Sequence, residues 1–419
     1  MTVVGNTAKP DEEWEIEHVY GYRTSDCQQN LRYNDKGEAV YMVAALGIVL
    51  NTGTLEQRFY GGKEVGDAKH KSNADQLAFH RDDIISLDIS ADRKLVATGQ
   101  TGKSPSVHVW NSETCEQVCS FALDSKARGV SAVSISPCGR YVASVDMSND
   151  HKVNIYNIQR EKNLLNIEGG KEKILDIAWS KRPEDYRFAT ISQKEIKFWH
   201  PADVTKKLSQ KGVFGKVPMT NFTSLAFDDE GWCYTGGENG HIHVFSDACS
   251  VVKSIKAHAN AISAVVHADG KLLSAGKDKK IAIISAQGGN FKLDKFVEIS
   301  GSFPRSLDYF NGNLLVGLRN GSIAEFKDVL GSEEATENTL MQSHFEGETW
   351  GLAIVQDGKY ILTSGDDNKF ILYNVDEKKA ERVGKVSDHK PKNAAKAKST
   401  ASTMSVYPAN QQVRAIAYS

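Results

Sequence analysis

The stretch that decides the fold reads IISLDIS at residues 84–90, LVATG at 95–99 and VHVWN at 107–111. It begins with a short apolar run, passes through polar turns and ends in an alternating run that closes on the aromatic residue Trp110. Runs of this length, rich in β-branched and aromatic residues and bounded by turn residues, predict strands. The stretch therefore predicts one unit of several antiparallel strands.

The same pattern recurs along the chain with a period of about 40 to 48 residues. A fixed period in this range, with several strands per unit, predicts a β-propeller of the WD40 type, which is an all-β fold. Such a ring usually offers its surface to partners. After the first unit, the pattern occupies residues 130–136, 141–145 and 153–157; 174–180 and 196–199; 222–227 and 242–245; 262–266 and 281–284; 305–309 and 323–326; 350–355 and 370–373.

The bulk composition is that of a globular chain and excludes several classes. The 419 residues carry a net charge of −2, which argues against binding nucleic acid by bulk electrostatics. No run of 18 apolar residues predicts a membrane span, and residues 1–17 lack the apolar core of a signal peptide. The six cysteines form no CxxC pair, so we expect free thiols and no disulfide framework.

The two ends of the chain are expected to share one further sheet. We read residues 1–17 as a flexible leader and residues 18–62 as a module with strands near 38–45, 47–51 and 57–60 but no innermost strand of its own. Residues 413–419 have the pattern of an innermost strand, either closing that sheet or starting a further repeat. With the repeats of residues 63–382, this arrangement favours eight blades; seven remain if the N-terminal module packs outside the ring.

A basic segment interrupts the rhythm at residues 383–412. It has no apolar periodicity, and its lysines are separated by Ala, Ser and Pro, which predicts a mobile loop that tethers the last strand. These lysines are Lys385, Lys390, Lys392, Lys396 and Lys398.

Two repeats carry His, Ser or Thr, and Asp at matching offsets. In WD repeats such residues and a terminal aromatic residue link by hydrogen bonds within a blade. A His and an Asp also suggest a catalytic pair, but the recurrence of the same offsets favours the structural reading. The predicted network comprises His258, Ser274 and Asp278 in one repeat, and His344, Thr363, Asp367 and Tyr373 in another.

No catalytic constellation stands out, so we predict no enzyme, cofactor, metal site or small-molecule substrate. The run ATGQTGKS at residues 97–104 resembles a relaxed P-loop. A phosphate-binding loop opens a helix, whereas Pro105 and Ser106 lead here into the strand at 107–111. A nucleotide site is therefore rejected. An enzyme using the central channel would need a buried charged cluster there.

The N-terminal module resembles the HELP motif of the echinoderm microtubule-associated protein-like (EMAP-like) family. The resemblance covers about residues 14–376 and rests on motifs in the same order. They are YGYR at 20–23, Asp26-Cys27, Gly37-Glu38-x-Val40-Tyr41, Ala44-Ala45, QRFY at 57–60, DDI at 82–84, ATGQ at 97–100, VDMSNDH at 145–151, GKDKK at 276–280 and WGLA at 350–353.

The resemblance implies a non-enzymatic cytoskeletal protein that binds tubulin, microtubules or their associated proteins. It also implies the cytoplasm, on microtubules or in a cilium or axoneme. Family members usually carry a coiled coil and a basic stretch before the HELP motif, which residues 1–17 do not resemble, and often a second propeller. The alternative is a general WD40 adaptor for signalling or ubiquitin ligation, unrelated to tubulin. We expect no contact with nucleic acid or membranes.

The loops of one face of the ring are the expected contact surface. Candidate partner-binding residues near strand ends are Arg128, Arg305 and Arg319, together with the five lysines of the basic segment. The lysines could supply part of the positive charge that the family uses against the acidic tubulin surface.

Overall fold

The structure is a computed structural model that describes residues 15–62, 78–124, 126–182, 185–201, 208–331 and 335–385. All regular structure in these ranges is β-strand, arranged in eight antiparallel four-stranded sheets. In every sheet the strands neighbour one another in sequence order. The repeat period of the sequence thus corresponds to one sheet. The expected all-β propeller fold and its eight four-stranded sheets are confirmed, and seven of these sheets form the closed ring.

The strand bounds follow the predicted runs closely. The first two sheets contain β1 (Arg32–Tyr33), β2 (Ala39–Val43), β3 (Leu46–Leu50), β4 (Gln57–Tyr60), β5 (Ile84–Ile89), β6 (Leu95–Gln100), β7 (Ser106–Asn111) and β8 (Gln117–Ala122). The next two contain β9 (Val130–Ile135), β10 (Tyr141–Asp146), β11 (Val153–Asn157), β12 (Lys162–Ile167), β13 (Ile174–Trp179), β14 (Phe188–Ser192), β15 (Ile196–Trp199) and β16 (Ser209–Lys211). The fifth and sixth contain β17 (Phe222–Phe227), β18 (Cys233–Gly237), β19 (His241–Phe245), β20 (Val251–Lys256), β21 (Ile262–Ala268), β22 (Lys271–Gly276), β23 (Lys280–Gln287) and β24 (Asn290–Glu298). The last two contain β25 (Pro304–Phe310), β26 (Asn313–Leu318), β27 (Ile323–Phe326), β28 (Glu337–Met341), β29 (Thr349–Val355), β30 (Tyr360–Gly365), β31 (Lys369–Asn374) and β32 (Lys379–Lys385).

The N-terminal sheet has its own innermost strand, which corrects the sequence-based expectation. Arg32 and Tyr33 form β1 and pair with Val40 and Ala39 of β2. Two residues, one of them charged, are too short and too polar to be recognised as a strand by pattern. Residues 413–419, expected to supply this strand, lie outside the described residues.

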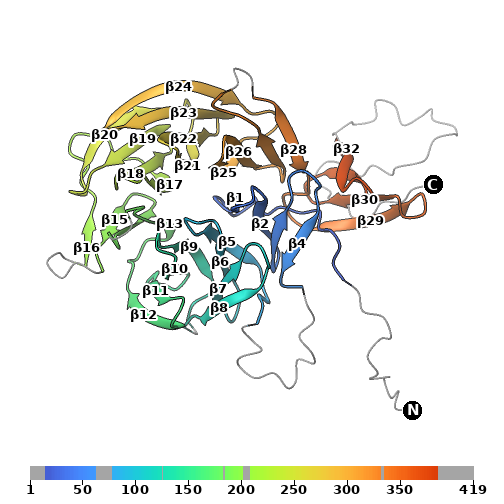
Figure 1. Cartoon of the computed structure of the whole chain (residues 1–419), viewed down its shortest axis with the longest axis horizontal. Helices are drawn as coiled ribbons and strands as arrows, with labels where there is room; N and C mark the ends of the chain where they lie inside the picture. Colours follow the sequence, from blue (N-terminus) through green and yellow to red (C-terminus); the bar gives the residue numbers. More distant parts are fainter. Residues whose placement is uncertain are drawn as a thin grey trace, which may run out of the picture.

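The inner strand β1 closes the ring next to β25. Asp308 of β25 accepts a hydrogen bond from the Tyr33 backbone N–H at 2.7 Å, as Asp88 accepts one from Ile135 at 3.0 Å inside the ring. The Arg93 guanidinium pairs with the same Asp308 carboxylate at 2.6 Å. Because these bonds join successive inner strands, the ring runs β1, β5, β9, β13, β17, β21, β25 and back to β1 (Figure 1).

The eighth sheet, β29–β32, is set to the side of this ring, and its strand β32 contacts β28 (Figure 1). Tyr20, in the segment that leads to the first sheet, packs on Tyr373 of β31 with ring centroids 4.2 Å apart. The Tyr373 hydroxyl donates to the Gln342 carbonyl at 3.1 Å. The N-terminal module therefore occupies the place next to β25 where the eighth sheet would otherwise complete the ring.

The inner strand of the eighth sheet exposes apolar side chains at positions where the other inner strands bury theirs. Leu352 and Ile354 of β29 are 68% and 71% exposed. At the same register of β17, Leu225 and Phe227 are 5% and 1% exposed, because they pack against the preceding sheet. Among the described residues, no sheet packs on β29 in this way, since the N-terminal sheet stands between β25 and the rest of the ring.

The core consists of apolar layers between successive sheets. At the first junction, Tyr60 of β4 stacks on Trp110 of β7 with ring centroids 5.0 Å apart. At the closing junction, Leu31 and Tyr33 pack against Leu315 and Ile323 of the β25–β28 sheet. Each layer buries one face of two sheets, so radial repetition replaces a single central core.

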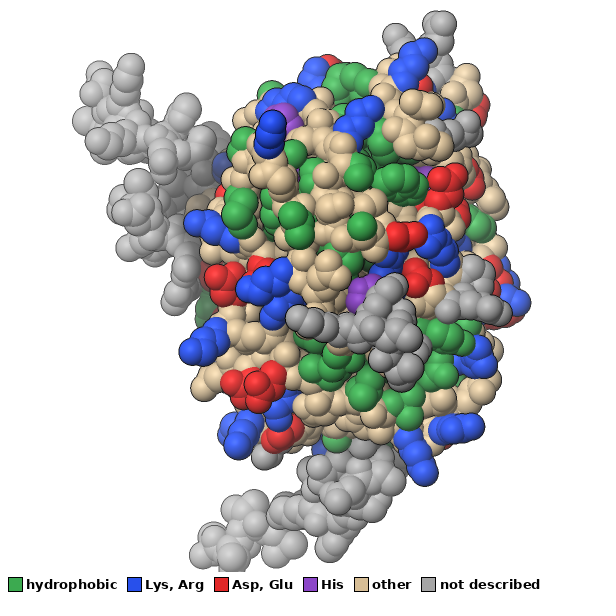
Figure 2. Space-filling model, turned by 90° about the vertical axis from the view of Figure 1, so that its left-hand side faces the viewer, with side chains coloured by type: hydrophobic (Ala, Val, Ile, Leu, Met, Phe, Trp, Pro, Cys, Tyr) green, Lys and Arg blue, Asp and Glu red, His purple; other side chains and the backbone are tan. Residues whose placement is uncertain are grey.

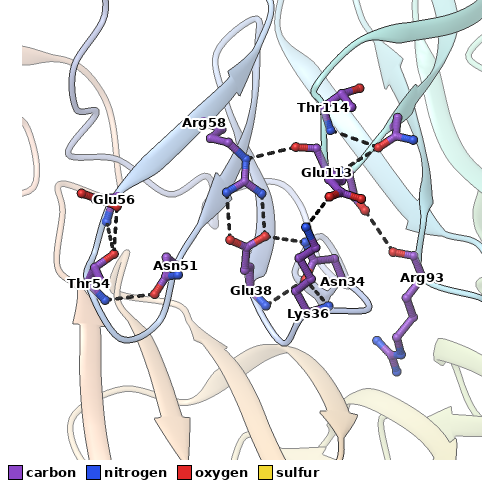
Figure 3. Close-up of polar contacts among 12 residues, drawn as sticks. Asn34, Lys36, Glu38, Asn51, Thr54, Glu56, Arg58, Arg93, Glu113 and Thr114 are labelled. Atoms are coloured by element: carbon purple, nitrogen blue, oxygen red, sulfur yellow. Dashed lines mark hydrogen bonds and ion pairs between the residues drawn. The ribbon is translucent and has the colours of Figure 1, made fainter.

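An ion pair joins Glu38, the residue before β2, to Arg58 of β4. Arg58 binds Glu38 through two bonds of 2.8 and 2.6 Å, and its Nε donates to the Glu113 carbonyl (Figure 3). Asn34 donates to Glu38 at 2.7 Å, and the Lys36 ammonium contacts the Glu113 carboxylate. This network ties the first sheet to the turn after β7 and so fixes its place in the ring.

Candidate functional site

One face of the ring is defined by where the inner strands begin. In a four-stranded antiparallel meander, the start of the first strand and the turn between the second and third strands lie at the same end. Hydrogen bonds join these two segments, as from Thr101 N to Asp83 O at 2.9 Å and from Arg319 N to Phe303 O at 3.0 Å. We call this side, formed by the loops that enter the inner strands and by the second-to-third strand turns, the top face.

All three arginines predicted from the sequence lie on the top face. Arg128 is exposed in the loop before β9, and its carbonyl accepts the Gly102 N–H at 3.1 Å. Arg305 is the second residue of β25 and lines the cavity at the centre of the ring. Its Nε and Nη2 donate to the Cys27 carbonyl at 3.2 and 2.9 Å. Arg319 follows β26, and its guanidinium stacks on Phe345 at 5.2 Å.

The structure brings two of the three arginines together and leaves the third apart. Burial lowers the pKa of the Arg305 guanidinium, and the positive charge of Arg319 lowers it further. Two sheets, the N-terminal sheet and β5–β8, lie between Arg128 before β9 and the two other arginines. The three predicted arginines thus lie on one face of the ring but do not form a single site.

The basic segment is described only at its first lysine. Lys385 is exposed at the end of β32, so Val383–Lys385 belong to a strand and not to the expected loop. The remaining four, Lys390, Lys392, Lys396 and Lys398, lie outside the described residues.

Hydrogen bonds join the His, Ser or Thr, and Asp side chains of both predicted networks. The Tyr373 hydroxyl, predicted as a member of the second network, donates to the Gln342 carbonyl. His258 places Nδ1 3.0 Å from Asp278 and Nε2 2.9 Å from the Ser274 hydroxyl. Burial lowers the pKa of the His258 imidazole, and Asp278 opposes that effect. The imidazole is enclosed within its blade, where it ties the loop before β21 to the turn after β22.

The second network has the same geometry at the eighth sheet. His344 lies 2.8 Å from Asp367 through Nδ1 and 3.0 Å from Thr363 through Nε2. Asp367 also accepts the Lys369 N–H at 3.2 Å, and the His344 hydrogen bond contributes to holding the pKa of its carboxyl low. The recurrence of one geometry in two separate sheets supports a structural role.

A third network of this kind was not predicted from the sequence. His80 places Nε2 2.7 Å from Thr98 and Nδ1 2.8 Å from Gln100, and Trp110 Nε1 donates to Thr98 at 3.3 Å. Here Gln100 stands where Asp278 and Asp367 stand in the other sheets. The signal was a His four residues before an inner strand, as in His258 before Ile262, but the missing Asp concealed it.

The central channel holds a charged cluster, which an enzyme reading would require. Arg32 Nε lies 3.7 Å from Asp88, and burial raises the pKa of the nearby Asp176 carboxyl to about 7. The channel has a volume of about 1140 Å³. Asp176 accepts the Leu225 N–H at 3.1 Å, the same bond between inner strands that Asp88 makes. These carboxylates therefore hold the ring together.

The segment that resembles a P-loop has no helix after it. Its Lys103 lies in the turn between β6 and β7, and the strand β7 follows. Among the described residues, no three His, Cys, Asp or Glu side chains gather closely enough for a metal ion. No helix within the described ranges has the length and apolarity that a bilayer crossing requires. None of the six cysteines, all of which lie in the described ranges, forms a disulfide.

Comparison with known proteins identifies the repeats and the N-terminal module. The family described as echinoderm microtubule-associated protein first β-propeller matches residues 78–307, more than half of the chain, and the HELP motif matches residues 9–48. The solved WD40 repeats of RRP9 superimpose with a TM-score of 0.55 at 12% identity, covering 70% of this chain and 87% of that one. At that identity the likeness concerns the fold alone, which is the propeller predicted from the repeat.

Two relatives span nearly the whole chain. The ciliary WD repeat-containing protein ctxp80 of Euplotoides octocarinatus is 34% identical over 380 residues, 90% of this chain and 51% of that protein. The 77 kDa echinoderm microtubule-associated protein of Strongylocentrotus purpuratus is 29% identical over 384 residues, 88% of this chain and 52% of that protein. The chain thus spans about half the length of these relatives. It belongs to the echinoderm microtubule-associated protein family, of which it carries the HELP motif and the first β-propeller.

Proposed function

We propose that this chain is a non-enzymatic, microtubule-associated protein that binds tubulin through the top face of its ring. The observation that carries the proposal is the family membership: the HELP motif and the first propeller are the parts shared with relatives named as microtubule-associated proteins. We further propose that it acts on cytoplasmic microtubules, including those of cilia, since one relative is named as a ciliary protein.

The distribution of charge supports the top face over the outer rim. On the rim formed by the sheets β13–β16 and β17–β20, Lys and Arg side chains alternate with Asp and Glu among apolar groups (Figure 2). A mixed rim offers no single-sign field to an acidic partner. On the top face, Arg319 lies close enough to Arg305 for its positive charge to lower the pKa of the Arg305 guanidinium, which burial lowers most. Within the described residues, no ion pair includes either of these two arginines.

Co-pelleting with polymerised microtubules, beside gel filtration with tubulin dimers at low and moderate salt, tests the proposal. We expect association that weakens as salt rises, because contacts between exposed charges are screened. Charge reversal of Lys385, Lys390, Lys392, Lys396 and Lys398 to Glu tests whether the basic segment contributes to lattice binding. Association with the dimer alone would assign a tubulin-capturing role.

The general adaptor remains the alternative, and the same assays decide between the two. A folded protein that binds neither microtubules nor tubulin at low salt would contradict the proposal and favour an adaptor unrelated to tubulin. The control for folding is an unchanged urea unfolding midpoint of each variant.

A further inference from the structure

A shallow depression on the top face gathers three cations that the sequence reading did not group. It lies between the turn after β6 and the loop before β9 and has a volume of about 480 Å³. Lys103, Lys126 and Arg128 line it and are exposed. Within the described part of the chain, none of the three forms an ion pair. We call this the basic depression.

Hydrogen bonds hold the two loops of the basic depression in a defined arrangement. The Arg128 carbonyl accepts both the Gly102 N–H at 3.1 Å and the Thr101 hydroxyl at 3.0 Å. The Lys126 N–H donates to the Asp124 carboxylate at 3.1 Å. These hydrogen bonds join the turn that carries Lys103 to the loop that carries Arg128.

Acidic neighbours offset only part of the positive charge of this cluster. Asp82 is the one carboxylate among the residues that line the depression. It lies against Gly102, which leaves room for the carboxylate because it has no side chain. Asp124 is engaged by Lys152 at 3.2 Å. Three cations against one lining carboxylate leave the depression positive in a chain whose net charge is −2.

We propose that the basic depression docks an acidic, glutamate-rich polypeptide segment of the partner. The inference rests on the proposed function, and it names the chemistry that one part of the top face recognises. An open depression with exposed cations suits several carboxylates of an extended segment better than one enclosed ion. Nucleic acid is disfavoured because its binding draws on many phosphate contacts, whereas this depression offers three cations.

The test uses the full chain and a fluorescent peptide of about ten residues rich in glutamate, followed by anisotropy at low and moderate salt. We expect the variant Lys103→Glu/Lys126→Glu/Arg128→Glu to lose roughly tenfold in affinity, and the wild type to bind more weakly as salt rises. The matched control is Lys94→Glu/Lys162→Glu/Lys292→Glu, which reverses three exposed lysines off the top face and should leave affinity unchanged.

Several outcomes would overturn the inference. They are an absence of peptide binding by the wild type, an equal loss in both triple variants, or equally tight binding of an oligonucleotide of the same charge. Because the altered side chains are exposed, both variants should keep the wild-type unfolding midpoint; Arg128→Gln, which removes one charge, provides a milder check. If microtubules still co-pellet with the wild type, the proposed function stands although the inference fails.

Discussion

At the scale of the residue, the polar networks of this protein serve the ring. Glu38 of the HELP motif and Arg58 of β4 meet in a bidentate pair. His80, His258 and His344 each bind a Ser or Thr within their blade. Such side chains resemble catalytic groups in the sequence, but their partners are neighbouring strands and turns.

The Glu38→Gln variant tests the ion pair of the motif. We expect a loss of about 1–3 kcal/mol in the free energy of unfolding, because Arg58 would lose its charged partner at a buried position. Urea unfolding at pH 7.5 measures the loss, with the exposed Glu116→Gln as control, which should stay within about 0.5 kcal/mol of wild type. Equal midpoints for both variants would show that the pair contributes nothing.

The same pair has a predictable dependence on pH. Hydrogen bonds from Arg58 hold the pKa of the Glu38 carboxyl below its ordinary value. A carboxyl whose folded pKa is depressed stabilises the protein above its unfolded pKa, and that stabilisation is lost as pH falls through the folded pKa. The difference between wild type and Glu38→Gln should therefore shrink when unfolding is measured below about pH 4.

Buried histidine gives a second pH dependence, at higher pH. Burial lowers the pKa of His80 to about 4, so between about pH 6.5 and 4 the unfolded chain binds the extra proton. This single group should cost about 2 kcal/mol of stability on going from pH 7.5 to 5. Urea midpoints at the two pH values should differ less for His80→Gln than for wild type; identical pH dependence would contradict the assignment.

At the scale of the element, two strands behave differently from their counterparts. The two-residue β1 completes a ring that its length would not suggest, through Tyr33 and Asp308. Conversely, β29 has the pattern of an inner strand but leaves Leu352 and Ile354 exposed. Burial of a strand face depends on which sheet lies beside it, and the strand's own pattern does not specify that neighbour.

The exposure of β29 leads to a prediction by matched substitution. Leu352→Ser should change the free energy of unfolding by no more than about 0.5 kcal/mol, because the side chain already meets solvent. Leu225→Ser, at the same register of β17, should cost about 2–5 kcal/mol, since it leaves a cavity and a buried hydroxyl between two sheets. Comparable losses in urea unfolding would mean that a neighbour covers β29.

Because Asp308 lies at the junction between β25 and β1, its substitution should lower the free energy of unfolding more than substitution of an exposed Asp. Asp308→Asn removes the charge that pairs with Arg93 in a buried position, which should cost about 3–5 kcal/mol. Hydrogen exchange should quicken at the Tyr33 amide. Asp294→Asn, which breaks the more exposed pair with Lys271, should cost at most about 1 kcal/mol and leave Tyr33 unchanged.

At the scale of the whole molecule, the ring closes without the eighth sheet. The N-terminal sheet joins β25 to β5, whereas β29–β32 packs at the side through Tyr20 and Tyr373. The HELP motif is therefore part of the propeller itself. Seven sheets around one axis leave no open edge between the first and last of them, which is the physical advantage of a closed ring.

Truncation from either end tests this closure. A chain that ends at residue 348 should keep the β-sheet circular dichroism and a cooperative thermal transition, because every inner-strand junction of the ring remains. A chain that starts at residue 34 should lose both, since it lacks β1 and the Tyr33–Asp308 bond. The reverse pattern would place the eighth sheet in the ring and the N-terminal sheet outside it.

The sequence by itself determined the repeat, the strands and the family. The strand runs could be read because alternation and turn residues are local signals, as at residues 153–157, predicted and observed as β11. The motifs around Glu38 and Arg58 identified the family for the same reason: they are contiguous in the chain. The two His networks were read from offsets that repeat within single units.

Only the tertiary structure decided how the sheets close into a ring, where Lys103, Lys126 and Arg128 gather, and which inner strand remains exposed to solvent. Ring closure depends on Tyr33 meeting Asp308, residues far apart in the chain, and no local period encodes that contact. Lys103, Lys126 and Arg128 share one depression because a turn of one sheet meets the loop that enters the next. The exposure of Leu352 follows from the N-terminal sheet occupying the neighbouring position, a competition between two sheets that is settled only when the whole chain has folded.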